Sequence, residues 1–401
     1  MKYVIVLGDG MADEPVEQLG GRTPLAAART PVMDALAAQS EIGMTQTIPK
    51  GMKPGSDTAN LAVLGYDPAI YYSGRSPLEA LSIGIEMEPS DIAIRCNIVT
   101  ISENPDLPFE EQTILDHSSG EISTEDCAVL LEAVRKELED ETYRFYVGTS
   151  YRHCLIWKGG SVLDLTAPHD VLGQRIGEHL PQDAHLLAMM RRSYEILKDH
   201  PLNRARKEQG LNPANCCWFW GAGTKPSLAS FTEKTGKRGV MISAVDLLKG
   251  IAAGSKMTVI NVPGANGGLH TNYEGKADAA FDALTKDGYD FAYIHVEAPD
   301  EMGHQGSAEK KIQAIEYLDE RVIGRLKQKL DEAGVEYRMM VMPDHPTPVA
   351  KRTHTDKPIP YLLYDSAHPQ EHTWKYNEAE AEASGNFFPE GSRLIEKLFS
   401  V

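Results

Sequence analysis

Short apolar runs alternate with longer amphipathic stretches along the chain. Residues 307–332 give the clearest helical pattern, because apolar side chains recur there at steps of three and four. A helix between two buried strands is the βαβ unit, so the pattern predicts an α/β fold with a mostly parallel sheet sandwiched by helices. The runs expected to be buried strands are residues 4–7, 257–262, 291–296, 338–342 and 360–364.

The middle of the chain has a different pattern. Residues 91–100 and 145–157 alternate between apolar and polar positions, and a charged helix is expected over residues 124–139 between them. This is typical of a smaller α+β domain. We expect residues 88–182 to form such a domain, inserted into a larger domain of residues 1–87 and 183–401. The reason is that polar motifs at strand ends on both sides of it point to one site.

The charge balance excludes two classes of partner. The chain has 401 residues and a formal net charge of −18, and so acidic a protein repels nucleic acid and anionic membranes. No apolar run approaches the ~20 residues of a membrane span, and the apolar core of the first ten residues is too short for a signal peptide. We therefore expect a cytoplasmic protein. The five cysteines are scattered without a CxxC pair, which favours buried thiols over a metal site or disulfides.

Several predicted strands are followed or preceded by carboxylate and imidazole side chains. In open α/β sheets the chemistry lies just beyond the carboxyl ends of the strands. The motifs are VIVLGDG, FAYIHVEAPDEMGH, RMMVMPDH and THTDKPIPYLL. They supply Asp9, Asp300, His304, Asp344, His345 and His354.

This set of residue types indicates a metal centre. Carboxylates and imidazoles together suit Mn²⁺ or Zn²⁺, and six ligands are too many for one catalytic ion with an open position. Two ions roughly 3.5–4 Å apart would use them, as in enzymes that transfer phosphoryl groups. Taken singly, an Asp after a strand is also a common helix N-cap, and a lone His is often structural.

The segment KPGSDTANLAVLGYDP adds a candidate nucleophile. Gly55 gives the backbone freedom, and Ser56 opens a predicted helix that ends near Leu64. A serine at a helix N-terminus lies where a phosphate is stabilised, and metal coordination activates its hydroxyl. The alternative is that Ser56 or Asp57 simply caps the helix.

Taken together, these motifs resemble the archaeal type of cofactor-independent phosphoglycerate mutases, in the alkaline phosphatase superfamily. The resemblance covers nearly the whole chain, and the order of the motifs is that of the family. The fold it implies is alkaline-phosphatase-like. Beside the motifs already quoted, it is carried by RTPLAAARTPVMDALA, YYSGRSPLEALSIGI and VPGANGGLHTNYEGKADAA.

The resemblance implies a role for each candidate ligand. Asp9, Ser56, Asp344 and His345 are expected to bind one divalent ion, and Asp300, His304 and His354 the other. Mn²⁺ is the expected metal, with Zn²⁺, Mg²⁺ and Co²⁺ as alternatives. Ser56 would carry the phosphoryl group transiently while 2- and 3-phosphoglycerate interconvert, without 2,3-bisphosphoglycerate. The inserted domain would shield this intermediate from water, which otherwise makes the enzyme a phosphatase.

An anionic substrate also needs cations. Arg75 and Arg152 are the best candidates, because the planar guanidinium suits carboxylate and phosphate; Lys225 is a weaker one. His153, beside Arg152, is a candidate to shuttle protons to the substrate hydroxyls. For Arg75 and Lys225 the alternative is a surface or interdomain ion pair. Asp57, His117 and His270 stay unassigned.

Three functions remain open from the sequence. The first is an isomerase of the phosphoglycerates, in glycolysis or gluconeogenesis. The second is a phosphotransferase on the same scaffold with another acceptor such as homoserine, and the third is a metal-dependent phosphatase. No GxxxxGK[ST] motif is present, which disfavours a kinase of the P-loop class. The expected partner is a small phosphorylated carboxylic acid, and a homo-oligomer is compatible with the sequence.

Overall fold

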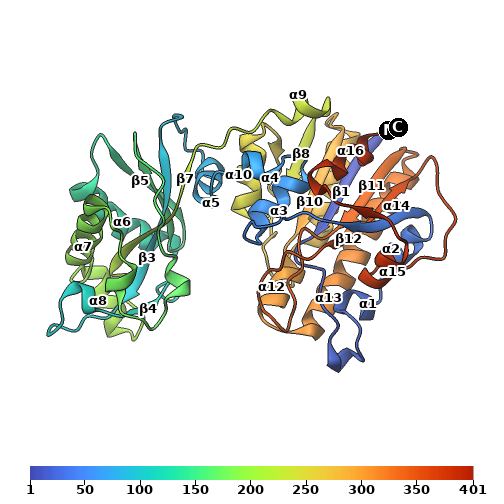
Figure 1. The fold of residues 1–401 in the computed structure, drawn as a ribbon. Coiled ribbons are helices and arrows are strands. Elements are labelled where there is room, and N and C mark those ends of the chain that lie inside the picture. Colours follow the sequence, from blue (N-terminus) through green and yellow to red (C-terminus); the bar gives the residue numbers. More distant parts are fainter. Residues whose placement is uncertain (401) are drawn as a thin grey trace. The chain divides into compact units, whose positions relative to one another are not determined.

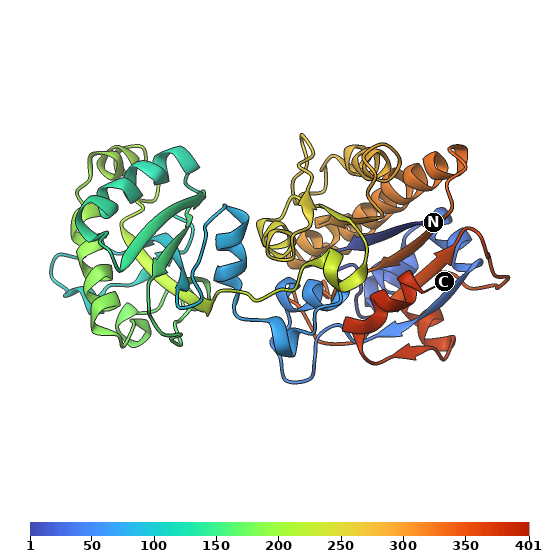
Figure 2. The same ribbon diagram turned by 90° about the horizontal axis from the view of Figure 1, so that it is seen from above.

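The computed structural model describes residues 1–400, which form two compact units (Figures 1 and 2). The first unit comprises Met1–Tyr72 and Ser227–Val401, and the second comprises Ser73–Pro226. The second unit is wider than the inserted domain predicted over 88–182. The helices that flank this range, Arg75–Ser82 and Ala184–Leu197, pack on the sheet of the second unit and extend it on both sides.

The first unit is built on an eight-stranded sheet in the order β13-β2-β12-β11-β1-β10-β8-β9. Only β12 runs against its neighbours, and every other pairing is parallel. The mostly parallel sheet is thus confirmed. The strands are β1 (Lys2–Gly8), β2 (Ser40–Thr45), β8 (Gly239–Ile242), β9 (Thr258–Val259), β10 (Phe291–Val296), β11 (Tyr337–Met342), β12 (Ile359–Asp365) and β13 (Phe387–Phe388).

Helices cover both faces of this sheet, as Figure 1 shows. Alternate residues of the central strands point to opposite faces, so Val4 and Ile294 join one core while Tyr3 and Phe291 pack against Phe399 on the other face. The first face is covered by α1 (Pro24–Ala27), α2 (Pro31–Ala37), α11 (Tyr273–Thr285), α13 (Ala308–Tyr317) and α14 (Arg325–Glu332). The second face is covered by α3 (Ser56–Val63), α9 (Phe231–Thr235), α10 (Asp246–Gly254) and α16 (Leu394–Phe399). The remaining helices of this unit are α4 (Pro68–Tyr71), α12 (Ala298–His304) and α15 (Glu378–Ala383).

The helix predicted over 307–332 is present, with one irregularity. Between α13 and α14 the segment Leu318–Gly324 is π-helical. Asp319 lies in this segment, and its carboxylate accepts hydrogen bonds from the N–H groups of Val32 (3.1 Å) and Met33 (2.6 Å) at the start of α2. The irregular turn therefore satisfies backbone donors of a neighbouring helix.

The second unit is an antiparallel sheet with helices, the α+β pattern expected of the middle of the chain. Its central strand β3 pairs with β7 along one side and with β6 and β4 along the other, and β5 pairs with β6. The strands are β3 (Ile92–Ile101), β4 (Ile114–Asp116), β5 (Tyr143–Thr149), β6 (Arg152–Trp157) and β7 (Cys216–Thr224). The helices are α5 (Arg75–Ser82), α6 (Thr124–Leu138), α7 (Ala184–Leu197) and α8 (Pro201–Glu208).

The predicted strands differ in how much of them forms. β10 has the predicted bounds, whereas only Thr258–Val259 of the predicted 257–262 is strand. β9 lies at the sheet edge and pairs with β8 alone, so fewer of its residues find ladder partners. Among the residues that the structure describes, no helix is both long and apolar enough to cross a bilayer.

Candidate metal centre and anion-binding face

The predicted ligands gather at one edge of the first unit's sheet. Asp9 follows β1, Asp300 lies in α12 just after β10, and Asp344 follows β11. These three strands are adjacent and parallel, so their carboxyl ends bring residues far apart in the sequence to one place.

Strand direction also explains the positions of His354 and Ser56. His354 precedes β12, and because β12 is antiparallel to β11, its beginning lies at the edge where β11 ends. β2 runs parallel to β1 in this sheet, and Ser56, at the start of α3, follows it. The structure thus brings all seven predicted metal ligands to one edge of the sheet.

Asp300, His304 and His354 form the first ligand group. The Nε2 atom of His304 lies 3.1 Å from Asp300 Oδ2, and the Nε2 atom of His354 lies 3.4 Å from Asp300 Oδ1. The two Nε2 atoms are themselves 3.0 Å apart. The carbonyl of Arg352 lies 3.0 Å from His304 Nδ1 and so fixes the orientation of that ring. Three donor atoms therefore converge from two segments.

The second ligand group surrounds the Nε2 atom of His345. This atom lies 3.0 Å from Ser56 Oγ, 3.4 Å from Asp344 Oδ2 and 3.5 Å from Asp9 Oδ1. Asp9, Asp344 and His345 are buried. Asp300 also comes within reach of Asp9 and His345, so the two groups are neighbours in one cluster.

Gly10 permits this close packing. Its φ angle is +59°, which favours glycine, and a Cβ there would lie 2.5 Å from both Asp300 Oδ1 and Thr347 Oγ1. Its N–H donates to Asp344 Oδ1 at 3.0 Å. A side chain at this position would displace the Asp300 carboxylate and the Thr347 hydroxyl.

The electrostatics of the cluster fit a bound cation. Oδ1 of Asp9 is buried and has no hydrogen-bond partner among residues 1–400. Burial and the nearby carboxylates of Asp344 and Asp300 raise the pKa of Asp9 well above its usual value. The hydrogen bond to Asp300 raises the pKa of His304 to about 9. Buried carboxylates and facing imidazoles of this kind are the donor set that divalent transition metals take.

The second unit gathers cations on one face of its sheet. Arg95 of β3 and Arg75 of α5 both contact Glu79 Oε1, at 3.0 and 2.9 Å. Arg152 of β6 also lies near Glu79, and these arginines hold the pKa of Glu79 below its usual value although burial opposes this. We call Arg75, Arg95, Arg152 and Trp220 the arginine face; the Arg95 guanidinium stacks on Trp220, 4.8 Å from the ring centroid.

Arg95 is incompletely satisfied. Its side chain is 7% exposed, and its Nε atom has no hydrogen-bond partner among the described residues. A buried guanidinium with an unused donor is suited to a carboxylate or phosphate ligand.

His153 does not reach the arginine face. Residues directly opposite in an antiparallel pair share a side of the sheet, and His153 stands opposite Cys96 whereas Arg152 stands opposite Asn97. Its Nε2 lies 3.0 Å from Cys127 Sγ of α6, and its Nδ1 accepts from the N–H of Gly148. Both ring nitrogens are thus used inside the core beneath the helices.

The other residues singled out from the sequence are dispersed. Lys225 is exposed directly after β7, and His270 is exposed in a loop of the first unit. Asp57 is buried and accepts from the hydroxyl of Tyr72 at 2.7 Å. The ring of His117 lies 5.8 Å from that of Tyr151, which directly precedes Arg152 in the sequence.

Several residues of the site escaped the sequence analysis. Asn60 donates to Asp344 Oδ2 (2.8 Å), and the Thr347 hydroxyl contacts Asp300 Oδ1. His295 lies 2.8 Å from Asp9 Oδ2, and Arg95 joins Arg75 and Arg152. The available signal was a polar residue inside an apolar strand run, FAYIHV for His295 and IAIRCNIV for Arg95.

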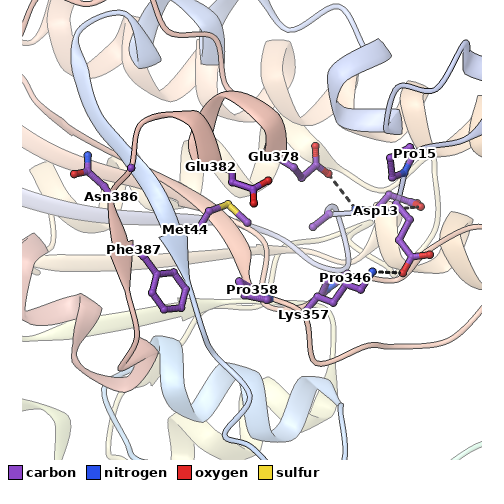
Figure 3. Close-up of a pocket in the computed structure, with 13 residues that line it drawn as sticks. Asp13, Pro15, Met44, Pro346, Lys357, Pro358, Glu378, Glu382, Asn386 and Phe387 are labelled. Atoms are coloured by element: carbon purple, nitrogen blue, oxygen red, sulfur yellow. Dashed lines mark hydrogen bonds and ion pairs between the residues drawn. The ribbon is translucent and has the colours of Figure 1, made fainter.

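A pocket of about 610 Å³ lies beside the loop that carries His354 (Figure 3). At one wall Lys357 donates to Glu14 (2.7 Å), and Glu378 accepts from the N–H of Asp13 (3.0 Å). The charged side chains that line it are mostly carboxylates, and its lysine, Lys357, is already paired with Glu14. The pocket is therefore unsuited to a phosphorylated acid, and its contacts tie the His354 loop to the loop after β1.

Comparison with known proteins agrees with this architecture. The family model described as 2,3-bisphosphoglycerate-independent phosphoglycerate mutase matches residues 37–203. The chain is 45% identical over 409 residues to the 2,3-bisphosphoglycerate-independent phosphoglycerate mutase of Methanosarcina acetivorans, covering 100% of both chains. It is also 45% identical over 405 residues to a probable member from Geobacter sulfurreducens, covering 99% of each.

Solved structures show the same relationship. A Pyrococcus horikoshii protein superposes with a TM-score of 0.81 at 27% identity, covering 99% of this chain and 96% of the other. The cofactor-independent phosphoglycerate mutase of Thermoplasma acidophilum superposes with a TM-score of 0.61 at 27% identity, covering 99% of each chain. With its full-length relatives at 45% identity, the chain belongs to the family of 2,3-bisphosphoglycerate-independent phosphoglycerate mutases.

Proposed function

We propose that this protein interconverts 2-phosphoglycerate and 3-phosphoglycerate, with the phosphoryl group passing through Ser56. Membership of the mutase family supports the reaction, which makes the protein an isomerase that needs no 2,3-bisphosphoglycerate. The observation that carries the route is the position of Ser56 Oγ, 3.0 Å from His345 Nε2 at the centre of the second ligand group.

Two divalent cations fit the two ligand groups. Asp300, His304 and His354 would hold one, and Asp9, Ser56, Asp344 and His345 the other, as the family resemblance implies. When bound, such ions lower the pKa of a coordinated hydroxyl and stabilise negative charge on the transferring phosphoryl oxygens. Mn²⁺ is the metal we propose.

Ser56 acts as the phosphoryl acceptor and then as the donor. Its oxygen attacks the phosphorus of the substrate, the bond to the glycerate oxygen breaks, and the proton lost by the serine hydroxyl is taken up by that glycerate oxygen. The glycerate then turns, its other hydroxyl attacks the phosphoserine, and the proton of this hydroxyl returns to the oxygen of Ser56 as the serine is released. The first residue of α3 suits this role because the N-terminal N–H groups and the helix dipole favour negative charge there.

The arginine face binds the carboxylate of the substrate in this proposal. Arg75, Arg152 and the half-satisfied Arg95 are the cations that support it. Lys225 is exposed directly after β7 and stays a weaker candidate. We leave His153 out of the proton transfer, because both its nitrogens have partners in the core.

The second unit also serves in this proposal to keep water from the phosphoserine. This role, a homo-oligomeric state and a cytoplasmic location stay predictions of the sequence. The substrate class itself, a small phosphorylated acid, follows from the family.

Phosphorus NMR tests the reaction directly. The full chain with Mn²⁺ and 3-phosphoglycerate, without 2,3-bisphosphoglycerate or nucleotide, should build up a 2-phosphoglycerate resonance. Inorganic phosphate as the sole product would instead identify a phosphatase. No new resonance from metal-loaded protein would reject the mutase, and homoserine with phosphoryl donors would then be the next substrate to assay.

A further inference from the structure

The two oxygens of the Asp9 carboxylate have different surroundings. Oδ2 lies 2.8 Å from Nε2 of His295, whereas Oδ1 is buried without a hydrogen-bond partner in the part of the chain described. Oδ1 lies 3.5 Å from His345 Nε2, on the side of the ligand cluster. One oxygen is thus held by the protein, and the other is left for a ligand.

Ser243 contacts the ring nitrogen of His295 that does not face Asp9. Its Oγ lies 3.2 Å from His295 Nδ1 and accepts from the N–H of Val245 at 3.0 Å. A carboxylate that binds a cation is ionised and only accepts hydrogen bonds, so the ring proton of His295 is on Nε2 and the Ser243 hydroxyl donates to Nδ1. Nδ1 is then an acceptor, and Nε2 is the protonated nitrogen that donates to Asp9.

The fold keeps this chain of hydrogen bonds in place. Ser243 directly follows β8, and His295 lies in the neighbouring strand β10, where Ile294 is in register with Ile242. The His295 side chain is fully buried, and its carbonyl accepts from the buried Lys276 ammonium at 2.7 Å. The ring therefore has little freedom to turn away from Asp9.

We propose that Ser243 and His295 are positioning residues that hold Asp9 Oδ2 and thereby present Oδ1 to a divalent cation. They do not contact the cation or the substrate. The inference rests on the proposed metal centre and adds to it the residues that orient one of its ligands. Mutation of a residue that hydrogen-bonds to a metal ligand commonly lowers metal affinity by about 10–100-fold.

Titration with Mn²⁺, followed by the EPR signal of the free ion, measures this effect without any substrate. The wild-type chain should bind two ions tightly. His295→Leu removes the donor to Asp9, and we expect one of the two ions to bind about 10–100-fold more weakly while the other is unchanged. His295→Gln places an amide N–H near the position of Nε2 and should recover most of the affinity.

Ser243→Ala and a control complete the design. Ser243→Ala removes the hydroxyl that donates to His295 Nδ1, so the affinity for the same ion should fall, but by less than in His295→Leu. His153→Leu removes a similarly buried imidazole from the second unit and should leave both affinities unchanged. Far-UV circular dichroism checks the fold of each variant.

A folded His295→Leu protein that binds both Mn²⁺ ions as tightly as the wild type would overturn the proposal. Should that variant fail to fold, unchanged affinities for both ions in Ser243→Ala would overturn it instead, as would a folded His295→Gln protein that binds one ion about 10–100-fold more weakly than the wild type. The result is separable from the proposed reaction: wild-type protein that binds two ions but makes no 2-phosphoglycerate would refute the reaction alone.

Discussion

The two units collect charge in opposite ways. The first gathers carboxylates and imidazoles at the edge of a parallel sheet, and Asp9 Oδ1 is left there without a partner. The second gathers guanidinium groups on the face of an antiparallel sheet around Glu79, and Arg95 Nε is left without one. Among the described residues, Asp9 Oδ1 is thus an unpaired buried acceptor of the ligand cluster, and Arg95 Nε is an unpaired buried donor of the arginine face.

This difference separates two tasks of a phosphoryl-transfer enzyme. A cluster rich in carboxylates repels an anionic substrate unless cations are bound to it, so its chemistry depends on metal. A guanidinium group is charged at any physiological pH and needs no added ion to attract a carboxylate. Variants of the first unit should therefore affect turnover and metal binding, and variants of the second should affect substrate affinity.

The largest effect is expected from Ser56→Ala. Losing the only proposed phosphoryl acceptor should lower turnover by about 10⁴-fold or more, while the metal ligands of both groups other than Ser56 remain. The phosphorus NMR assay measures turnover, and Mn²⁺ titration checks that ions still bind.

Ser307→Ala is the matched control. Ser307 caps α13 by accepting from the N–H of Lys310, so this change should cost some stability but no turnover. Substantial turnover in Ser56→Ala would disprove the phosphoserine route.

Metal removal should abolish activity and destabilise the first unit selectively. Without cations the buried carboxylates of Asp9, Asp300 and Asp344 repel one another. Saturating Mn²⁺ at about 100 times its dissociation constant adds about 2.7 kcal/mol for each of the two ions, which together is about 10–20 °C in melting temperature for a unit of this size. Calorimetry with and without chelator measures this shift, and Mn²⁺ should restore both activity and stability.

Tryptophan fluorescence supplies the contrast between the units. Trp157, Trp218 and Trp220 lie in the second unit and Trp374 in the first. The fluorescence melt should thus change little on chelation. A fluorescence transition that shifts as much as the calorimetric one would contradict a metal centre confined to the first unit.

The same comparison shows what could be predicted from the sequence. Asp9, Asp300 and Asp344 each come after a parallel strand, and the ends of parallel strands share an edge whatever their order, so the motifs alone predicted that these carboxylates would meet. The assignment of Ser56 as a ligand came from the family resemblance instead. His354 reaches that edge only because β12 is antiparallel, a direction that the apolar pattern does not reveal.

Residues inside strands were harder to predict. Which face a strand residue occupies depends on register, and a shift of one residue exchanges the faces. Arg152 and His153 are neighbours in sequence, yet only Arg152 lies on the face with Arg95. The borders of the second unit were also beyond the pattern, since α5 and α7 join it through packing rather than through any local signal.

Arg152→Met tests the arginine face. A hydrogen bond between charged groups contributes about 1.5–3 kcal/mol, so we expect KM to rise by roughly 10- to 100-fold with metal affinity unchanged. Arg144→Met on β5 is the control, because Arg144 is an exposed arginine of the same sheet. A variant in which kcat falls while KM stays constant would contradict carboxylate binding by this residue.

The smallest effect concerns His153 and the pH dependence of the second unit. Burial lowers the pKa of His153 to about 4, from 6.5 for an exposed histidine. Between these two pH values the unfolded chain binds a proton that the folded chain does not, so the stability present above pH 6.5 is lost progressively as the pH falls. Between pH 7 and 5.5 the loss is about 1 kcal/mol.

His153→Gln should remove this part of the pH dependence, because glutamine keeps hydrogen-bonding groups near Cys127 and Gly148 but does not titrate. Fluorescence-detected urea unfolding at several pH values measures it, since three of the tryptophans are in the same unit as His153. The wild type and the variant should differ in slope below pH 6.5 and agree in slope above it. Equal slopes throughout would mean that His153 takes up its proton in the folded unit as readily as in the unfolded chain, which would contradict its burial beside Cys127 and Gly148.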